Sequence, residues 1–227
     1  MKEEDWKQAD PALSLITVLK QGENEPVTIT GESSDLQCVG IGTDAAVFVY
    51  TPLPSYAFKL YTQEALSKKQ AEIDVYQALD GSPYFPVYYG DGERYIVISN
   101  ESGMTLYDCL INGVSVPRQV IDDVEDARQF VREKGLNPRD IHLKNILLQN
   151  GRGKVLDVSE YVQDGNDKRW EHLAWAYNNF YPLFEGKKVP VSVLEAVKKR
   201  YYRQDPNSGS LVDFANRMTR LFTRKKR

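Results

Sequence analysis

The sequence predicts an α+β protein in which strands gather before residue 101 and helices follow. Segments 38–49 and 56–61 are rich in β-branched and aromatic residues and read as short, half-buried strands. Segment 118–134 instead repeats apolar residues at intervals of three and four, which is typical of an amphipathic helix. The chain has 227 residues, 41% hydrophobic and 27% charged, which is ordinary globular composition with enough material for a substantial core.

Residues 1–34 form an N-terminal extension ahead of the main strands. It contains two candidate strands, at 13–19 and 27–30, with turn-forming residues at 22–26 between them. The sequence assigns this extension no role.

Segment 38–49, CVGIGTDAAVFV, follows the glycine-hairpin pattern G-x-G-x-x-G-x-V. Gly40, Gly42 and Val47 match the pattern, and Ala45 stands at the third glycine position. Small residues there let backbone N–H groups approach phosphate oxygens closely. The same residues also suit an ordinary β-turn, and Ala45 limits how closely the hairpin can approach.

The strand 56–61 contains one lysine, Lys59, among alternating apolar positions. The helical spacing over 63–79 ends at Asp80-Gly81, a plausible helix stop. Glu72 on that helix is the natural ion-pair partner for Lys59, although Glu64 and Asp74 compete for the role. A lone lysine in a strand is also common as a solvated edge residue.

Segment 137–157 places Asp140, Asn145 and Asp157 at intervals of five and twelve residues. Between the last two, apolar runs flank Asn-Gly-Arg-Gly at 150–153, which predicts two short strands joined by a tight turn. That hairpin would bring Asp157 back beside Asn145. Asn145 and Asp157 could then bind Mg²⁺ through hard oxygen ligands, and Asp140 could take a proton from an acceptor hydroxyl. An isolated pattern of this kind also occurs on surface turns.

In this order, the motifs resemble those of the protein-kinase-like superfamily from about residue 37 to residue 177. The resemblance implies a two-lobed fold, with ATP bound between the lobes. The N-lobe, 35–101, would be an antiparallel sheet with one helix, and the C-lobe, 102–227, would be mainly helical.

The resemblance also implies a role for each candidate residue. Lys59 would neutralise the phosphates of ATP and pair with Glu72, and Asp140 would be the catalytic base. Asn145 would act in catalysis by holding Mg²⁺ together with Asp157, and Mn²⁺ also suits such oxygen ligands. The remaining nucleotide contacts would come from the glycine hairpin and the hinge: Gly40, Gly42, Ala45, Val47, Ser99 and Glu101.

Three departures narrow the resemblance. Pro138 and Ser159 replace the usual His and Gly, and His142 replaces the usual Lys two residues after Asp140. Only residues 160–167 separate Ser159 from the next helix, with no A-P-E sequence, so the chain looks like an atypical, RIO-like bacterial Ser/Thr protein kinase. Arg139 and Asp167 would then be structural, Asp167 by holding the catalytic-loop backbone.

Two alternatives stay open for the function. The Asp-x-His-x-x-Asn core also occurs in aminoglycoside and choline phosphotransferases, so the acceptor could be a small molecule. The chain could also be a pseudokinase that binds nucleotide and acts as a scaffold, although Lys59, Asp140, Asn145 and Asp157 are all retained.

Composition excludes several other classes. Cys38 and Cys109 are too few and too far apart for a disulfide framework or a zinc motif, and the P-loop pattern is absent. No apolar run approaches the ~20 residues that span a bilayer, and the acidic start is unlike a signal peptide, so we expect a cytoplasmic protein.

The C-terminal region is basic, although the net charge is −3. Segment 198–227 has ten basic residues against two acidic ones, and the chain ends in Arg-Lys-Lys-Arg. Such a tail could bind DNA or an anionic membrane surface, or simply be a solvated end. Within it, one face of a predicted amphipathic helix is formed by Leu211, Phe214, Ala215, Met218, Leu221 and Phe222.

Overall fold

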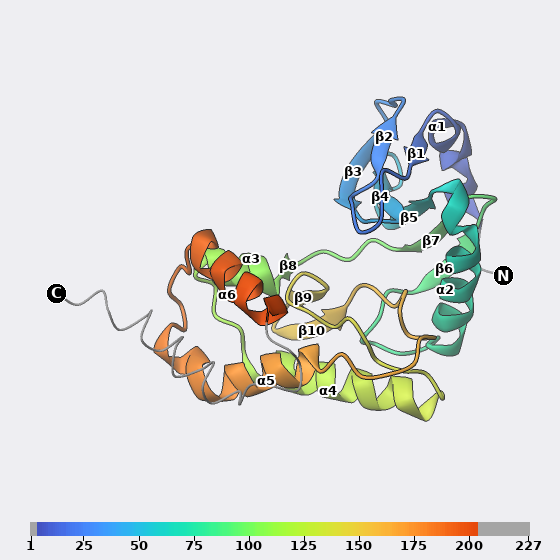
Figure 1. Ribbon diagram of the computed structural model, residues 1–227. Helices are drawn as coiled ribbons and strands as arrows, with labels where there is room; N and C mark the ends of the chain where they lie inside the picture. Colours follow the sequence, from blue (N-terminus) through green and yellow to red (C-terminus); the bar gives the residue numbers. More distant parts are fainter. Residues whose placement is uncertain (1–3, 204–227) are drawn as a thin grey trace.

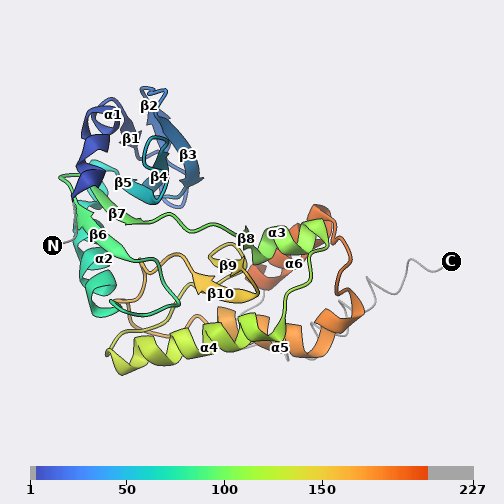
Figure 2. The ribbon, with the colours of Figure 1, turned by 180° about the vertical axis from the view of Figure 1, so that it is seen from behind.

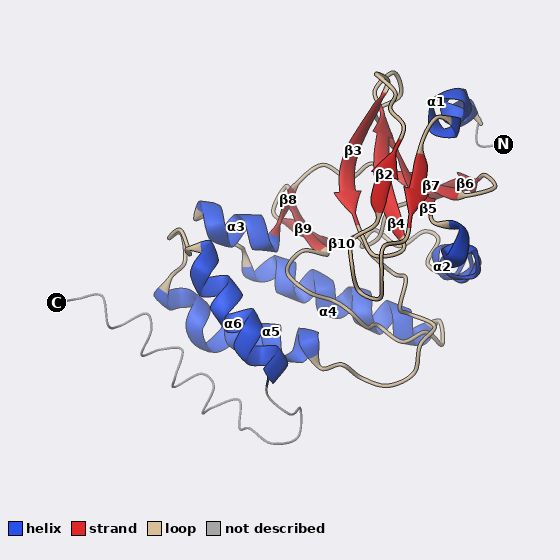
Figure 3. Cartoon of the chain, turned by 45° about the horizontal axis from the view of Figure 1, so that its top comes forward, coloured by secondary structure: helices blue, strands red, loops and turns tan. Residues whose placement is uncertain are grey.

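The computed structural model describes residues 4–203, which form an α+β fold, as predicted (Figure 1). The first part is built around a five-stranded antiparallel sheet of order β3-β4-β5-β7-β6. The chain then passes into a mainly helical part (Figure 3). The sheet strands are β3 (Leu36–Ile41), β4 (Ala45–Tyr50), β5 (Tyr56–Tyr61), β6 (Tyr88–Asp91) and β7 (Tyr95–Ser99).

The two faces of this sheet are covered by different segments. Alternate strand residues such as Ala57 and Ile96 share a core with Ile73 and Tyr76 of α2 (Leu66–Ala78), which follows a 3₁₀ turn at Gln63–Ala65. The neighbouring strand residues form a second core on the opposite face, which includes Phe48, Phe58, Leu60 and Val97. Successive side chains of each strand point to opposite faces of the sheet, and this alternation assigns them to the two cores.

The N-terminal extension covers that second face. It consists of a 3₁₀ helix (Asp5–Ala9), α1 (Asp10–Ser14) and the paired strands β1 (Thr17–Leu19) and β2 (Thr28–Thr30). The strand expected over 13–19 is therefore wrong in its first half. Pro11 lies in the first turn of α1, where proline is tolerated, and the buried Trp6, Ala9 and Leu13 recur at helical spacing.

Close packing and hydrogen bonds fix the extension to the sheet. The Tyr56 hydroxyl donates to Asp5 at 2.6 Å, and the Tyr95 hydroxyl donates to Asp10. A Cβ atom at Gly90 would lie 2.6 Å from the ring of Trp6, so only glycine allows this approach.

The predicted hairpin after the catalytic loop is present as β9 (Ile146–Gln149) and β10 (Arg152–Val155). Asn150 and Gly151 form its two-residue turn with φ values of 51° and 81°, as a type I′ turn requires. Strand β8 (Met104–Thr105) pairs with the other edge of β9.

The helical part contains α3 (Leu106–Asn112), α4 (Arg118–Glu133), α5 (Arg169–Phe180), a 3₁₀ turn (Tyr181–Leu183) and α6 (Val191–Arg203). Helices α4 and α5 lie below the β9–β10 hairpin, and α3 and α6 lie to one side of it (Figure 2). The apolar face predicted for α4 is fully buried. Asp123 of α4 accepts hydrogen bonds from the N–H of Gly153, at 2.7 Å, and from Arg152 of β10, so α4 supports the hairpin.

Within residues 4–203, no helix is long and apolar enough to cross a membrane. The amphipathic stretch predicted at 211–222 and the basic tail lie outside the described residues.

Candidate active site

Lys59, Glu72 and Asp157 meet between the sheet and the hairpin. Nζ of Lys59 in β5 lies 2.7 and 2.8 Å from the two carboxylate oxygens of Glu72 in α2. The same nitrogen lies 3.4 Å from Oδ1 of Asp157, just after β10. Of the three acids considered for Lys59, Glu72 is its partner, whereas Asp74 accepts a hydrogen bond from Gln70.

Burial and charge determine the protonation of this group. Burial opposes the charge of Lys59, but the carboxylates of Asp157 and Glu72 outweigh it and raise the pKa of the lysine. Burial raises the pKa of Glu72, and the charge of Lys59 opposes that rise. Burial also opposes the ionisation of Asp157, but Lys59 and the hydrogen bonds from Ser159 lower its pKa. A protonated Lys59 beside an ionised Asp157 follows.

Two tyrosines that sequence reasoning missed stabilise this arrangement. The buried Tyr61 hydroxyl donates to Oε2 of Glu72 at 2.6 Å. The Tyr76 hydroxyl donates to the carbonyl of Leu156 at 3.1 Å and so links α2 to the residue before Asp157. Tyr61 follows Lys59 by two residues on the same strand, so both side chains lie on the same face of the sheet. This spacing was the sequence signal that could have placed Tyr61 near the lysine.

The hairpin returns Asp157 to the catalytic loop. The N–H of Leu156 donates to the carbonyl of Asn145 at 2.8 Å. Nδ2 of Asn145 donates to the carbonyl of Asp140 at 3.2 Å, which leaves Oδ1 as the oxygen that this side chain can offer to a metal. The structure thus brings Asp140, Asn145 and Asp157 to one place.

Asp167 holds Asp140 in position. Asp140 has a positive φ of 52°, an uncommon conformation for a residue with a side chain. Its N–H donates to Oδ2 of Asp167 at 2.9 Å, as expected from the sequence, and Oδ1 of Asp167 accepts from the N–H of Arg169 at 3.0 Å. One carboxylate therefore joins the catalytic loop to the start of α5.

Arg169 brings a cation to Asp140. Its guanidinium forms ion pairs with Oδ1 of Asp140 and, at 3.5 Å, with Oδ2 of Asp167. No sequence motif pointed to this arginine, because the contact joins residues far apart in the chain.

His142 faces the same carboxylate from the loop itself. Its Nδ1 accepts a hydrogen bond from the N–H of Lys144 at 3.2 Å, and its Nε2 lies 3.8 Å from Oδ1 of Asp140. Burial lowers the pKa of His142, although Asp157 opposes the shift. A neutral His142 with its proton on Nε2 is consistent with both contacts.

The glycine hairpin is supported from outside. Gly40 lies within β3, and Gly42 follows the last residue of that strand. The N–H of Gly42 donates to the carbonyl of Ala45 at 2.9 Å. Val47 lies in β4 and is half-buried. The N–H of Val27 donates to the carbonyl of Gly42 at 2.9 Å, so the N-terminal extension braces the turn.

Asp44 lies at the tip of this hairpin, where a negative charge would repel phosphate. It forms ion pairs with Lys68 of α2, at 2.6 Å, and with Lys20, at 3.7 Å. Burial opposes its ionisation, but these lysines lower the pKa of its carboxyl. Sequence reasoning missed both the acid and its neutralisation.

Ser99, in the predicted hinge, already uses its N–H and its hydroxyl within the protein. Its N–H donates to the carbonyl of Val87 at 2.8 Å, and its hydroxyl donates to Glu101. Glu101 also pairs with Lys154 at 2.8 Å. The N–H of Ser99 is therefore not available to adenine, because it pairs with Val87, the residue just before β6.

Residues 160–167 lie against the catalytic loop. Nδ2 of Asn137 donates to the carbonyls of Gln163 and Gly165, and Arg139 donates to that of Asp164. Arg139 thus contacts this short segment directly, as its expected structural role requires.

Comparison with known proteins agrees with this geometry. The chain is 32% identical over 189 residues to a Bacillus subtilis (strain 168) protein named "Putative serine/threonine-protein kinase YrzF", covering 82% of this chain and 87% of that protein. The chain belongs to the protein-kinase-like superfamily. No family model matches this kinase-like chain.

Two solved structures of WbdD are also similar to this kinase-like chain. One is a complex with the kinase inhibitor LY294002, 13% identical, with a TM-score of 0.47; it covers 85% of this chain and 46% of WbdD. The other is 14% identical, with a TM-score of 0.45, and covers 78% and 43%. The chain thus spans less than half of either WbdD chain.

The kinase-like site suits a metal ion that is bound partly by protein side chains and partly by the phosphates of the substrate. Among residues 4–203, no group of three or more His, Cys, Asp or Glu side chains could hold a metal by itself. Mg²⁺ is commonly bound through one or two side chains together with substrate phosphates. Asn145 and Asp157 fit that arrangement.

Proposed function

We propose that this chain is an ATP- and Mg²⁺-dependent phosphotransferase that phosphorylates Ser or Thr hydroxyls of proteins. The observation that carries the proposal is the contact of Lys59 with both Glu72 and Asp157, beside a loop that presents Asp140 and Asn145. A partly buried, protonated lysine beside a more exposed carboxylate suits the binding of phosphates with a metal.

The reaction follows from these positions. Asp140 accepts the proton of the acceptor hydroxyl while that oxygen forms a bond to the γ-phosphorus of ATP. The bond from the γ-phosphorus to the β–γ bridging oxygen breaks, and ADP leaves with that oxygen. Lys59 stabilises the charge on the α- and β-phosphates, and Asn145 and Asp157 would hold Mg²⁺, which neutralises charge on the phosphates.

The proposed acceptor is a protein hydroxyl. The name of the B. subtilis relative favours Ser/Thr acceptors. A small-molecule acceptor is the second candidate, because Nε2 of His142 lies 3.8 Å from Asp140, where it can contact an acceptor hydroxyl.

A panel of acceptors tests both candidates. The purified chain would be incubated with γ-labelled ATP and Mg²⁺, alone, with a mixture of Ser/Thr substrate proteins, and with aminoglycosides and choline. We expect label on protein hydroxyls that is stable to acid and is released by strong base, as β-elimination from phosphoserine and phosphothreonine requires, and none on the small molecules.

Variants connect the transfer to the site. Asp140→Asn and Lys59→Met should abolish labelling, whereas Asp80→Asn, an exposed carboxylate after α2, should not. Label on small molecules alone would show that the acceptor is a small molecule and not a protein. ATP binding without any transfer would indicate a pseudokinase.

A further inference from the structure

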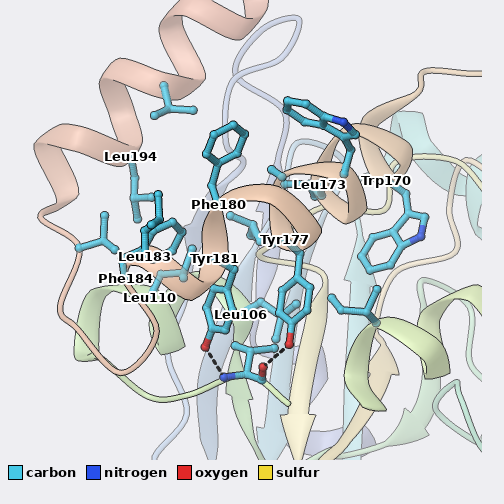
Figure 4. Close-up of a pocket in the computed structure, with 17 residues that line it drawn as sticks. Leu106, Leu110, Trp170, Leu173, Tyr177, Phe180, Tyr181, Leu183, Phe184 and Leu194 are labelled. Atoms are coloured by element: carbon cyan, nitrogen blue, oxygen red, sulfur yellow. Dashed lines mark hydrogen bonds between the residues drawn. The ribbon is translucent and has the colours of Figure 1, made fainter. Parts of the chain in front are cut away.

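An apolar cavity of about 190 Å³ lies in the helical part (Figure 4). Its walls come from α3, α5, the 3₁₀ turn after α5, and α6, and its lining residues are almost all apolar or aromatic. Val116 also lines the cavity. The N–H of Val116 donates to the Tyr181 hydroxyl at 2.6 Å, and the Tyr177 hydroxyl donates to the carbonyl of Val116 at 2.8 Å. These bonds satisfy the backbone polar groups of Val116 and leave an apolar lining.

Helix α5 is rich in apolar and aromatic residues, but the described elements cover it only in part. Its only fully buried residue is Trp170. Beyond its end, Leu183 is 54% exposed, and Val191 at the start of α6 is 50% exposed. A contiguous apolar surface of this kind normally contacts another element. The half-buried apolar residues of α5 are Leu173, Ala174, Trp175, Ala176, Tyr177 and Phe180.

The chain itself continues from this surface. Helix α6 lines the cavity with Leu194 and Val197 and runs to Arg203, where the described residues end. Twenty-four residues follow, and their first seven, Gln-Asp-Pro-Asn-Ser-Gly-Ser, are rich in turn-forming types. Seven extended residues reach up to ~23 Å, so a segment beyond them can return to the cavity.

The sequence of the next segment fits the surface. Six apolar residues, at 211, 214, 215, 218, 221 and 222, share one face when placed on a helix. Asp213, Asn216 and Arg220 share the opposite face. Twelve helical residues would be about 18 Å long, enough to cover several turns of α5.

We propose that residues 211–222 dock as an amphipathic helix over the apolar cavity formed by α3, α5 and α6. The occupant is this chain's own C-terminal segment, because the helix that lines the cavity leads directly into it. The inference concerns packing alone and does not depend on the proposed phosphotransferase activity.

Hydrogen exchange on the full-length chain tests the docking. Met218 is at the centre of the predicted apolar face and Asn216 is on the opposite face, so Met218→Asp and Asn216→Asp introduce the same side chain at contrasting positions. We expect the amides of residues 173–184 to exchange at least tenfold faster in Met218→Asp than in the unsubstituted chain. Asn216→Asp should behave as the unsubstituted chain does.

A reciprocal substitution in the cavity excludes a purely local effect of Met218→Asp. Leu183 lines the cavity but is largely exposed, so Leu183→Asp should leave the fold intact while exchange at 211–222 becomes faster. Leu15→Asp, at a 59% exposed leucine after α1, is the matched control and should leave that exchange unchanged.

Three outcomes would overturn the docking. In the first, exchange at 173–184 is the same in all variants. In the second, the protection disappears on dilution while light scattering reports a dimer, so a second copy is the occupant. In the third, the protection appears only after anionic phosphatidylserine vesicles are added, so the segment contacts a membrane surface.

Discussion

Arg169 forms an ion pair with Asp140, although 28 residues separate them in the sequence. Asp167 organises this contact, because its carboxylate accepts the N–H groups of both residues. The residue two positions after Asp140 is a histidine whose pKa burial lowers, so Arg169 supplies the cation at the proposed catalytic base.

Arg169→Ala should therefore lower kcat by about 10- to 100-fold and leave the KM for ATP nearly unchanged. The arginine forms ion pairs with Asp140 and Asp167, beside the acceptor hydroxyl in the proposed reaction. Steady-state kinetics at varied ATP would measure both parameters. Lys168→Ala, the exposed neighbour, is the control, and a rise in KM with kcat unchanged would argue against a role at Asp140.

Tyr61→Phe should affect both stability and transfer. It removes the 2.6 Å hydrogen bond to the buried Glu72, which should lower the free energy of unfolding by about 1 kcal/mol and reduce kcat/KM. Tyr56→Phe is the matched control, since it removes a 2.6 Å bond to Asp5 on the opposite face of the sheet. Equal losses of kcat/KM in the two variants would show that Tyr61 has no special effect on the site.

Asp123→Asn should lower stability in a pH-dependent way. Burial opposes the ionisation of Asp123, but hydrogen bonds from Arg152 and the N–H of Gly153 lower its pKa. A lowered carboxyl pKa stabilises the fold above the ordinary value near 4, and this contribution is lost as pH falls through the lower, folded-state value. We expect a loss of about 2 kcal/mol at pH 7 that shrinks towards pH 3.

Thermal unfolding of Asp123→Asn between pH 7 and pH 3 would measure this change. Asp122→Asn, which alters an exposed ion pair with Arg118 on the same helix, should show a much smaller loss. A difference between Asp123→Asn and the unsubstituted chain that stays constant with pH would contradict the assignment.

Gly90→Ala should loosen the N-terminal extension. The added methyl group would lie 2.6 Å from Trp6, and such overpacking costs about 1–3 kcal/mol. Since Val27 of the extension supports the carbonyl of Gly42, the KM for ATP should also rise. Calorimetry would measure the stability, and ATP titration would measure the KM. Gly22→Ala, in a loop, is the control. A stability loss without any change in the KM for ATP would show that the extension does not support the glycine hairpin.

Sequence reasoning succeeded where local patterns carry the information. The turn at Asn150 and Gly151 returns Asp157 to Asn145 because a two-residue turn fixes the register of the hairpin. The buried face of α4 followed in the same way from helical periodicity.

Contacts between distant segments could not be predicted in this way. The contacts of Tyr61 with Glu72, of Arg169 with Asp140 and of Asp44 with Lys68 depend on how separate elements pack, and no short motif contains both partners of any of them. At Ser99, pairing with Val87 extends beyond the regular strand and uses the N–H, so its predicted contact with adenine rests on the carbonyl alone and stays a prediction.

The central claim is that this chain transfers the γ-phosphoryl group of ATP to a hydroxyl whose proton Asp140 accepts, while Lys59 and Asp157 act on the phosphates and the metal. Single-turnover transfer from γ-labelled ATP with Mg²⁺, comparing the unsubstituted chain with Asp140→Asn, tests it most directly. We expect transfer to fall roughly a thousandfold or more in Asp140→Asn while the affinity for ATP is retained. Equal transfer by the two proteins, or no transfer by the unsubstituted chain despite bound ATP, would contradict the claim.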